Sequence, residues 1–493
     1  MLRKVIQSFI LIASLVISLQ MYYPGPRSFQ DQSVALAKST PRVNIYVDTS
    51  SPSLTSNFEL GMTSTDTTIF SPWMGGMHRR LRDADQFSKK NLSFLNVQIM
   101  GWGVDDPWPE PWRREPGNWA SLDEKLRMTL ATGATPVLTL CEAPWWMKGH
   151  LNADGSTTLL TGNREFSDMA YESRVLDNKV DDWLHLVRRV AERYMAPPYN
   201  VRYFQIWNEL KGYYNPGTNN WDINTWGGDP SGKNAKHGYT YMYNKVYDLL
   251  RKVASEKGIS RWDVKIGGPY VAMDTWPSNN QSNPSDFVKP YGAYDQRSLD
   301  ALQYWLRHKA GADFLTLSGH NRNRDGPKPD DPFLTSEKFG DVVKWIRGLD
   351  EKTYPGASWL PIWWSEWYAD PFNHFTRQYD DAVKAFAMIK LLKAGGAIAL
   401  MWGSEDAWAS DDHNRGGPLP WYYSVRAFNK NFGVGTRIYN AKSSSREVEV
   451  LASYCHAMLV NKTWYGLPVS VNGKNAWLDP YEVSVIPIPA SNC

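Results

Sequence analysis

The chain has 493 residues, enough for two or three average domains or for one large barrel with a small companion domain. Its charge is nearly balanced, with 54 Lys and Arg against 51 Asp and Glu, which argues against a dedicated nucleic-acid-binding protein. Hydrophobic residues at 42% and charged residues at 21% exclude an intrinsically disordered chain. The unusual feature is the number of aromatic residues, including 24 Trp, because such rings either fill a core or line a surface that binds flat, partly apolar ligands.

The N-terminus has the form of a secretory signal. Arg3 and Lys4 precede an uncharged apolar run from Phe9 to Leu19, which is shorter than the ~20 residues that a membrane span needs. The nearest cleavage site with small residues, Ala35-Leu36-Ala37, lies far beyond this run. The alternative that the segment is not cleaved and acts as a membrane anchor therefore stays open. We interpret residues 1–42 as a signal peptide or anchor with a leader. The protein is therefore expected to be secreted or extracytoplasmic, with membrane contact only if the segment is uncleaved.

The three cysteines, Cys141, Cys455 and Cys493, are too few for a disulfide scaffold. Cys455 and Cys493 share the C-terminal segment and are candidates for pairing in an oxidising compartment. Cys141 lies in an apolar run, where a buried thiol is expected.

Eight short apolar runs rich in β-branched and aromatic residues predict strands. They are Phe58–Thr63, Leu92–Trp102, Thr135–Ala143, Arg202–Glu209, Val264–Tyr270, Asp313–His320, Leu360–Trp367 and Ala397–Gly403. The predicted helices are His78–Lys90, Leu122–Thr132, Val180–Met195, Tyr239–Lys257, Ser298–Lys309, Glu337–Leu349, Tyr379–Ala394 and a weaker one near Pro420–Lys430. Eight successive βα units predict a (β/α)₈ TIM barrel over residues 58–431. An open doubly wound sheet would usually show a Gly-rich phosphate turn after its first strand, and the sequence has none there.

The last segment of the chain has a different pattern. Apolar and polar residues alternate in Arg446–Leu451 and Tyr481–Ile486, and the turn signal Asn472-Gly473 separates such runs. This pattern predicts a C-terminal antiparallel β-sandwich over residues 432–493. Because a unit of this size is small for an independent fold, we expect an N-terminal strand within 43–57 to complete it.

Two glutamates lie at the ends of predicted strands. The fourth strand ends in Trp207-Asn208-Glu209, and the seventh ends in Ser365-Glu366-Trp367. Chemistry in such barrels takes place at the carboxyl ends of the strands, and an unpaired carboxylate there is costly to bury. A buried ion pair with Lys or Arg is the structural alternative for either residue. Two carboxylates facing one pocket suit glycoside hydrolysis, which needs one protonated group and one ionised group.

These two motifs together resemble the retaining glycoside hydrolases of clan A, which are (β/α)₈ barrels. Lys265–Pro269 and Asp313–His320 look specifically like glycoside hydrolase family 39, and the resemblance covers about residues 43 to 490. It implies that Glu209 is the general acid/base and Glu366 the nucleophile.

The resemblance also implies three substrate-binding residues. Asn208 would hydrogen-bond the sugar 2-hydroxyl, His320 would lie near Glu366 and help to hold it, and Trp402 would form the floor under the bound sugar. The structural alternatives are a core histidine for His320 and barrel-core packing for Trp402.

The sequence departs from the clan at two strands. Many members carry Arg on strand two and His on strand three, whereas strand two here reads Asn96–Met100 and strand three ends in Cys141-Glu142. Glu142 is a third carboxylate at the rim, which either binds a substrate hydroxyl or pairs with a neighbouring Arg. These differences weaken any transfer of substrate identity.

The predicted strands place many tryptophans at one end of the barrel, at strand carboxyl ends or in the loops that follow. These are Trp73, Trp102, Trp108, Trp112, Trp119, Trp145, Trp146, Trp221, Trp226, Trp276, Trp367, Trp402 and Trp408. A core-filling role would place them within strands and on inward helix faces instead. We therefore expect most of them to line one rim as stacking surfaces for sugars, with Trp145, Trp146, Trp367 and Trp402 as candidate substrate contacts.

Other function classes fit less well. The nine histidines show neither His-x-His nor His-x-x-x-His spacing, so no metal site and no cofactor are predicted. A non-catalytic carbohydrate-binding barrel would be expected to lack one of the two carboxylates, whereas a transglycosylase would use the same pair. The sequence thus predicts a secreted retaining glycosidase of an oligosaccharide or polysaccharide, with its carboxyl groups ~5 Å apart. The sugar, exo or endo action and the oligomeric state stay open.

Overall fold

The computed structural model describes residues 41–64, 91–99, 107–141, 143–154, 156–160, 173–223, 238–277, 283–324, 329–372, 376–402, 418–489 and 493. Residues 1–40 of the predicted leader, the predicted helix His78–Lys90 and the candidate Glu142 lie outside these ranges, as do the predicted rim residues Trp73, Trp102, Trp226 and Trp408. Within them, no helix is both long enough and apolar enough to cross a membrane.

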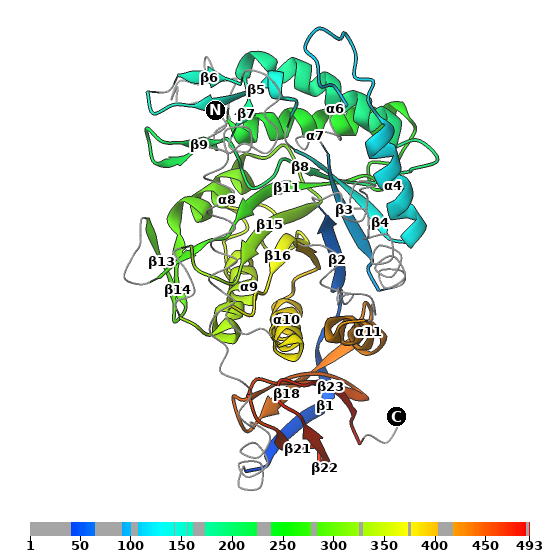
Figure 1. Cartoon of the computed structure of the whole chain (residues 1–493), viewed down its shortest axis with the longest axis vertical. Coiled ribbons are helices and arrows are strands. Elements are labelled where there is room, and N and C mark those ends of the chain that lie inside the picture. Colours follow the sequence, from blue (N-terminus) through cyan, green and yellow to red (C-terminus); the bar gives the residue numbers. More distant parts are fainter. Residues whose placement is uncertain are drawn as a thin grey trace, which may run out of the picture.

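A closed barrel of eight parallel strands forms the centre of the molecule (Figure 1). Its strands are β2 (Glu59–Ser64), β3 (Phe94–Ile99), β4 (Thr135–Leu140), β8 (Tyr203–Ile206), β11 (Lys265–Ala272), β15 (Phe314–His320), β16 (Ile362–Tyr368) and β17 (Ile398–Trp402). They follow one another around the barrel in chain order, and β17 pairs with β2 to close it. The predicted barrel is confirmed, and each predicted strand overlaps an observed one.

Helices alternate with these strands and cover the barrel (Figure 1). They are α4 (Ala120–Thr132), α6 (Val180–Tyr194), α7 (Tyr239–Glu256), α8 (Gln296–His308), α9 (Pro332–Arg347), α10 (Arg377–Lys393) and α11 (Pro420–Phe432). Their starts follow local chemistry: the side chain of Asp331 accepts hydrogen bonds from two amides of α9, and Pro332 occupies its first turn. Thr376 caps α10 in the same way.

Short strands occupy several connections between barrel strands and helices. They form three small sheets: β5 (Lys148–Leu151), β6 (Thr157–Leu159) and β7 (Arg174–Val175); β9 (Tyr214–Asn215) and β10 (Asn220–Trp221); and β12 (Thr275–Trp276), β13 (Pro284–Lys289) and β14 (Gly292–Asp295).

The amino-terminal half of the barrel interior is an apolar cluster. Phe94 of β3 contacts Trp363 of β16 with ring centroids 5.2 Å apart, although these strands are not neighbours, so the contact crosses the barrel. Phe314 of β15 stacks on Trp363 at 4.1 Å, and Val137, Ile398 and Leu400 complete the cluster. A much larger core lies between the strands and the surrounding helices.

The chain ends in a seven-stranded sheet of order β22-β21-β1-β18-β19-β20-β23. Its strands are β1 (Val43–Thr55), β18 (Arg437–Ser443), β19 (Val448–Ser453), β20 (His456–Asn461), β21 (Leu467–Val471), β22 (Lys474–Leu478) and β23 (Val483–Pro487). β1 runs between β18 and β21, so this early strand of the chain lies beside strands from its C-terminal part (Figure 1). Because β1 and β21 are parallel, the expected all-antiparallel pairing is wrong at this one place. The sandwich and the domain boundaries stay predictions.

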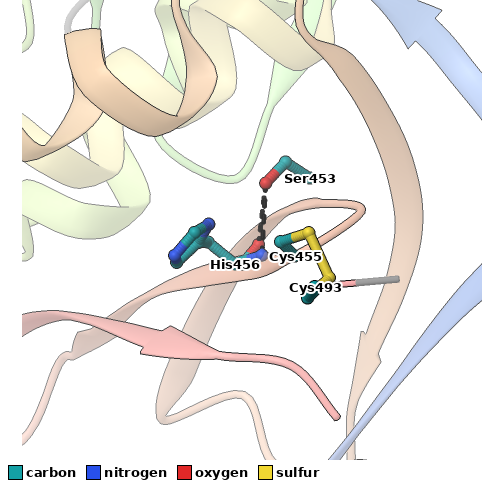
Figure 2. Close-up of a disulfide and its surroundings, with 4 residues drawn as sticks. All are labelled: Ser453, Cys455, His456 and Cys493. Carbon is teal, nitrogen blue, oxygen red and sulfur yellow. Dashed lines mark hydrogen bonds between the residues drawn. A yellow bond between two sulfur atoms is a disulfide. The ribbon is translucent and has the colours of Figure 1, made fainter. Parts of the chain in front are cut away.

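The C-terminal sheet packs against α10 and α11 of the barrel. Lys390 and Lys393 of α10 both pair with Glu449 of β19, at 2.9 and 2.6 Å. A disulfide joins Cys455, in the turn between β19 and β20, to the C-terminal Cys493 (Figure 2). This pairing and the burial of Cys141, which is not part of a disulfide, agree with the expectations from the sequence.

Candidate active site

Glu366 is the fifth residue of β16, and a β-bulge turns its side chain into the barrel. In the pairing with β15, Leu317 is opposite Trp364 but Ser318 is opposite Glu366, which leaves Ser365 as an extra residue. A bulge of this kind changes the direction of the side chains that follow it. Ser365 and Glu366 therefore both reach interior partners, while Trp364 and Trp367 face helix α9 and contact Phe339.

Three side chains from different strands hold the Glu366 carboxylate, which is only 3% exposed. Its Oε1 accepts hydrogen bonds from Gln98 Nε2 of β3 at 2.7 Å, from the Tyr270 hydroxyl of β11 at 2.8 Å and from Asn208 Nδ2, just after β8, at 3.5 Å. Burial raises the pKa of Glu366, and the charge of Lys211 together with these three hydrogen bonds acts in the opposite direction.

Tyr270 reaches Glu366 because of a second bulge. In the pairing of β11 with β15, Pro269 is opposite Thr316 and Val271 is opposite Leu317, so Tyr270 is the extra residue. Its φ of 59° lies in the left-handed region, which is uncommon for an aromatic residue. The fully buried Tyr270 thereby places its hydroxyl against the carboxylate.

Glu209 lies in a tight turn that begins where β8 ends. Trp207, Glu209 and Leu210 have φ values of 67°, 49° and 55°, all in the left-handed region. Such residues cost about 1 kcal/mol or more each and persist where the surroundings hold them firmly. Here the Trp207 amide donates to the Leu140 carbonyl at 2.9 Å, and its indole Nε1 donates to the Lys211 carbonyl at 2.8 Å.

The Glu209 side chain is 21% exposed, and Ser318 and Lys211 contact its carboxyl group. The Ser318 hydroxyl of β15 donates to Oε1, and Lys211 Nζ lies 3.1 Å from Oε2. Burial and the negative charge of Glu366 raise the pKa of Glu209 to about 8, against the Ser318 hydrogen bond. The two carboxyl groups thus share one poorly solvated site, in which burial and the charge of Glu366 favour the protonated form of Glu209.

A ring of buried polar side chains supports the pair from the barrel interior. Asn96 Nδ2 donates to Thr63 Oγ1 at 3.0 Å, and Thr139 donates to Asn96 Oδ1 at 2.6 Å. Gln205 donates to Thr139 at 3.2 Å and accepts from Ser365, while Thr63 donates to the Ser365 carbonyl. Five strands are joined in this way at positions with no solvent exposure. The ring holds Ser365 next to Glu366, so it fixes the bulge that aims the carboxylate.

The aromatic residues of the rim lie at the ends of β15, β16 and β17. Tyr368 packs between His320, at 4.8 Å between ring centroids, and Trp402, at 5.2 Å. Trp402 is 40% exposed, as a sugar platform requires. The ring nitrogens of His320 have other partners than expected: Nδ1 accepts from the Arg322 amide at 2.7 Å, and Nε2 lies 3.6 Å from Asp370.

Trp367 and His320 differ from their predicted roles. Trp367 is completely buried against α9 and α11, so it belongs to the core and not to a sugar site, because strand alternation directs it away from Glu366. His320 was expected to hold Glu366, a task that falls to Tyr270 and Gln98 among the described residues.

Trp145 and Trp146 are half-buried and contact the connection between β3 and α4. Trp145 donates to the Pro109 carbonyl at 2.8 Å, and Trp146 donates to that of Trp108 at 2.9 Å. The Trp146 ring also packs edge-on against Trp108 at 5.0 Å. Their indole N–H groups are therefore occupied, which leaves only ring surface for a ligand.

The sequence reasoning missed Gln98, Tyr270, Ser318 and Lys211. One signal was visible: Asn96 and Gln98 alternate with apolar residues, so both polar side chains face one side of a strand whose other side is buried. Tyr270 and Ser318 gave no such signal, because their positions depend on the two bulges. Within the described residues, no group of His, Cys, Asp and Glu is arranged to hold a metal ion.

No protein-family model matches this chain, and no curated protein matches it. Among solved structures it is similar to CelM2, a bifunctional glucanase-xylanase from a metagenome library, at 11% identity over 92% of this chain and 100% of that chain, with a TM-score of 0.56. It is also similar to a glucosidase from Croceicoccus marinus, at 12% identity over 92% and 85% of the two chains and a TM-score of 0.51. An α-L-arabinofuranosidase from Thermotoga maritima matches at 13% identity over 90% and 95%, with a TM-score of 0.50. At these identities the similarity shows a shared fold.

Proposed function

We propose that this protein is a secreted retaining glycoside hydrolase that cleaves O-glycosidic bonds of an oligosaccharide or polysaccharide with Glu209 and Glu366. The observation that carries the proposal is the contrast between two carboxyl groups in one site. Burial raises the pKa of both groups, but three hydrogen bonds and the charge of Lys211 act against this at Glu366, whereas the charge of Glu366 adds to it at Glu209, whose pKa is raised to about 8. The names of the similar structures, a glucanase-xylanase, a glucosidase and an arabinofuranosidase, support the same class of substrate.

The two glutamates divide the reaction between them. Protonated Glu209 gives its proton to the leaving glycosidic oxygen while ionised Glu366 attacks the anomeric carbon, which forms a glycosyl-enzyme ester. Glu209, now a carboxylate, then takes a proton from water, and that water displaces Glu366 from the anomeric carbon. If a sugar hydroxyl replaces the water, the same steps give transglycosylation.

The neighbours of Glu366 have defined tasks in this scheme. Tyr270 and Gln98 orient the attacking carboxylate and stabilise its charge. Asn208 also donates to Glu366, and its own Oδ1 is buried without a hydrogen-bond partner among the described residues. We assign this free acceptor to the sugar 2-hydroxyl. Lys211 lies close to Glu209, and its positive charge favours the ionised carboxylate of Glu366.

The finer assignments belong to the same proposal. Trp402 would form the sugar platform with His320 beside it, and Trp145, Trp146 and Glu142 would contribute further substrate contacts. Membership of family 39 and a sandwich in the C-terminal sheet rest on the sequence resemblance. Export from the cytoplasm is supported by the signal-like N-terminus and by the Cys455–Cys493 disulfide, because such bonds persist in oxidising compartments.

The test compares carboxyl variants on aryl glycosides. Glu366→Gln should lower kcat by roughly 10⁴-fold or more, because the nucleophile is lost. Glu209→Ala should lose most activity on poor leaving groups and recover part of it with azide, because this anion displaces Glu366 from the glycosyl-enzyme without the help of a general base. Glu256→Gln, at an exposed ion pair with Arg188, is the matched control and should keep full activity. Substantial activity in both site variants would refute the proposal.

A further inference from the structure

A groove of about 1060 Å³ lies between the barrel and the C-terminal sheet, outside the candidate active site. Residues of α10 and α11 form one wall, and residues at and near β20 and β23 form the other. We call it the junction groove and define it by Asp381, Tyr423, Ser424, Trp464 and Tyr481. Its volume matches that of binding sites for small ligands.

Asp381 is a buried carboxyl group of the junction groove that catalysis does not use. It is 4% exposed, and its Oδ2 accepts a hydrogen bond from the Ser424 hydroxyl at 2.8 Å. Among the described residues, its Oδ1 is buried without a hydrogen-bond partner, an arrangement that costs free energy. Burial raises the pKa of Asp381 to about 7. Asp381 therefore places a poorly solvated carboxyl group in the wall of the groove.

Two aromatic side chains lie open to solvent at the same groove. Tyr423 of α11 is 56% exposed, and Trp464, between β20 and β21, is 49% exposed. Large rings are seldom left open together beside a cavity without a binding role. Their flat faces suit the apolar faces of pyranose rings, and Tyr481 adds a third ring to the lining.

The charged residues that line the junction groove indicate which chemical class of ligand it can bind. Three carboxyl groups, from Asp381, Asp479 and Glu482, line the groove, and the described lining contains no Lys or Arg. Like charges would repel a uronate or a sulfated sugar. Carboxyl oxygens accept hydrogen bonds from hydroxyl groups, so a neutral sugar chain fits both the rings and the acceptors.

We propose that the junction groove is a second binding site that takes a neutral oligosaccharide segment of a polysaccharide. The site is separate from the catalytic pair, because the buried rings of Trp367 and Trp421 lie between β16 and α11. The choice of sugar as ligand rests on the proposed function. The groove would hold a long substrate to the enzyme while another part of the same chain occupies the active site.

The binding test uses the full chain with Glu366→Gln, which prevents turnover. Retardation is measured in native gels that contain soluble β-glucan, arabinoxylan, glucomannan, galactan or arabinan. Adding Tyr423→Ala and Trp464→Ala should weaken the apparent Kd for at least one of these by about tenfold, because two stacking faces are lost. Trp477→Ala is the matched control, since Trp477 is 47% exposed on the same sheet and does not line the groove. Unchanged thermal melting shows that each variant is folded.

The kinetic test separates this proposal from the catalytic one. With both glutamates present, Tyr423→Ala with Trp464→Ala should leave kcat/KM for an aryl glycoside unchanged and raise KM for the retarding polysaccharide. Equal retardation of the groove variant and the Trp477→Ala control would overturn the groove proposal and leave the catalytic one standing. The same gels are run with two charged polysaccharides, chitosan and polygalacturonate. Retardation by these charged chains alone would also overturn the groove proposal. Groove-dependent retardation without any turnover by the wild type would instead contradict the catalytic proposal.

Discussion

The two halves of the barrel interior differ in chemistry and in backbone geometry. In the amino-terminal half, Phe94, Phe314 and Trp363 pack as an apolar cluster on regularly paired strands. In the carboxyl-terminal half, interior positions carry amides, hydroxyls and carboxylates, and two strands are bulged. The left-handed residues Trp207, Glu209 and Tyr270 all belong to this second half.

This difference shows where stability and chemistry come from. Apolar packing stabilises the amino-terminal half. The carboxyl-terminal half contains a carboxyl group with a raised pKa and a strained turn, both of which cost stability. The hydrogen-bonded ring from Thr63 to Ser365 lies between them and gives the strained site a rigid support. Substitutions in the two halves should therefore affect different measurements.

The largest effect on stability is expected from Phe314→Ala in the apolar half. Removing this 1% exposed ring from its stack on Trp363 should lower the free energy of unfolding by about 3–5 kcal/mol. Urea unfolding followed by tryptophan fluorescence measures the loss. The folded fraction should keep its kcat, and a large loss of kcat without a loss of stability would contradict the division between the halves.

Tyr270→Phe tests the polar half. The variant keeps the ring and removes the donor to Glu366, so kcat should fall by about 100-fold, as for other donors to a reacting charge. The unfolding free energy should change by no more than about 1 kcal/mol. Steady-state kinetics with an activated aryl glycoside measures the first effect. Unchanged kcat would show that Tyr270 has no part in holding the carboxylate.

Ser318→Ala is expected to give a smaller effect, a shift in pH dependence. The acid role requires protonated Glu209, so kcat/KM should fall as pH rises through its pKa of about 8. The Ser318 hydrogen bond lowers that pKa, and its removal should therefore move the alkaline limb of the profile to higher pH. A shift to lower pH would contradict the assignment of this limb to Glu209.

The fold was largely predictable because its signals are local. Each barrel strand is a short apolar run, and period-2 or helical patterns need no knowledge of distant residues. The motif Trp207-Asn208-Glu209 and the Ser365-Glu366 pair also identified the two carboxylates. Tyr270 and Ser318 stayed hidden because register shifts between strands bring them to the site, and a register is set by tertiary pairing.

The tryptophans show the same limit. Position at a strand end does not tell which way a ring points: Trp402 is 40% exposed, whereas Trp367 is fully buried. Trp183, Trp305 and Trp364 also fill the core, so a composition rich in Trp serves packing as well as surface. Of the tryptophans predicted at the rim, Trp108 and Trp367 are buried, so the rim prediction is wrong for these two.

The proposed mechanism has Glu366 attack the anomeric carbon while Glu209 acts as acid and base. Its most direct test is the ¹H NMR spectrum of the first product released from an aryl glycoside, recorded before mutarotation. A double displacement with these two carboxyl groups ~5 Å apart predicts the same anomeric configuration as in the substrate. Release of the inverted anomer would contradict the assignment of Glu366 as nucleophile.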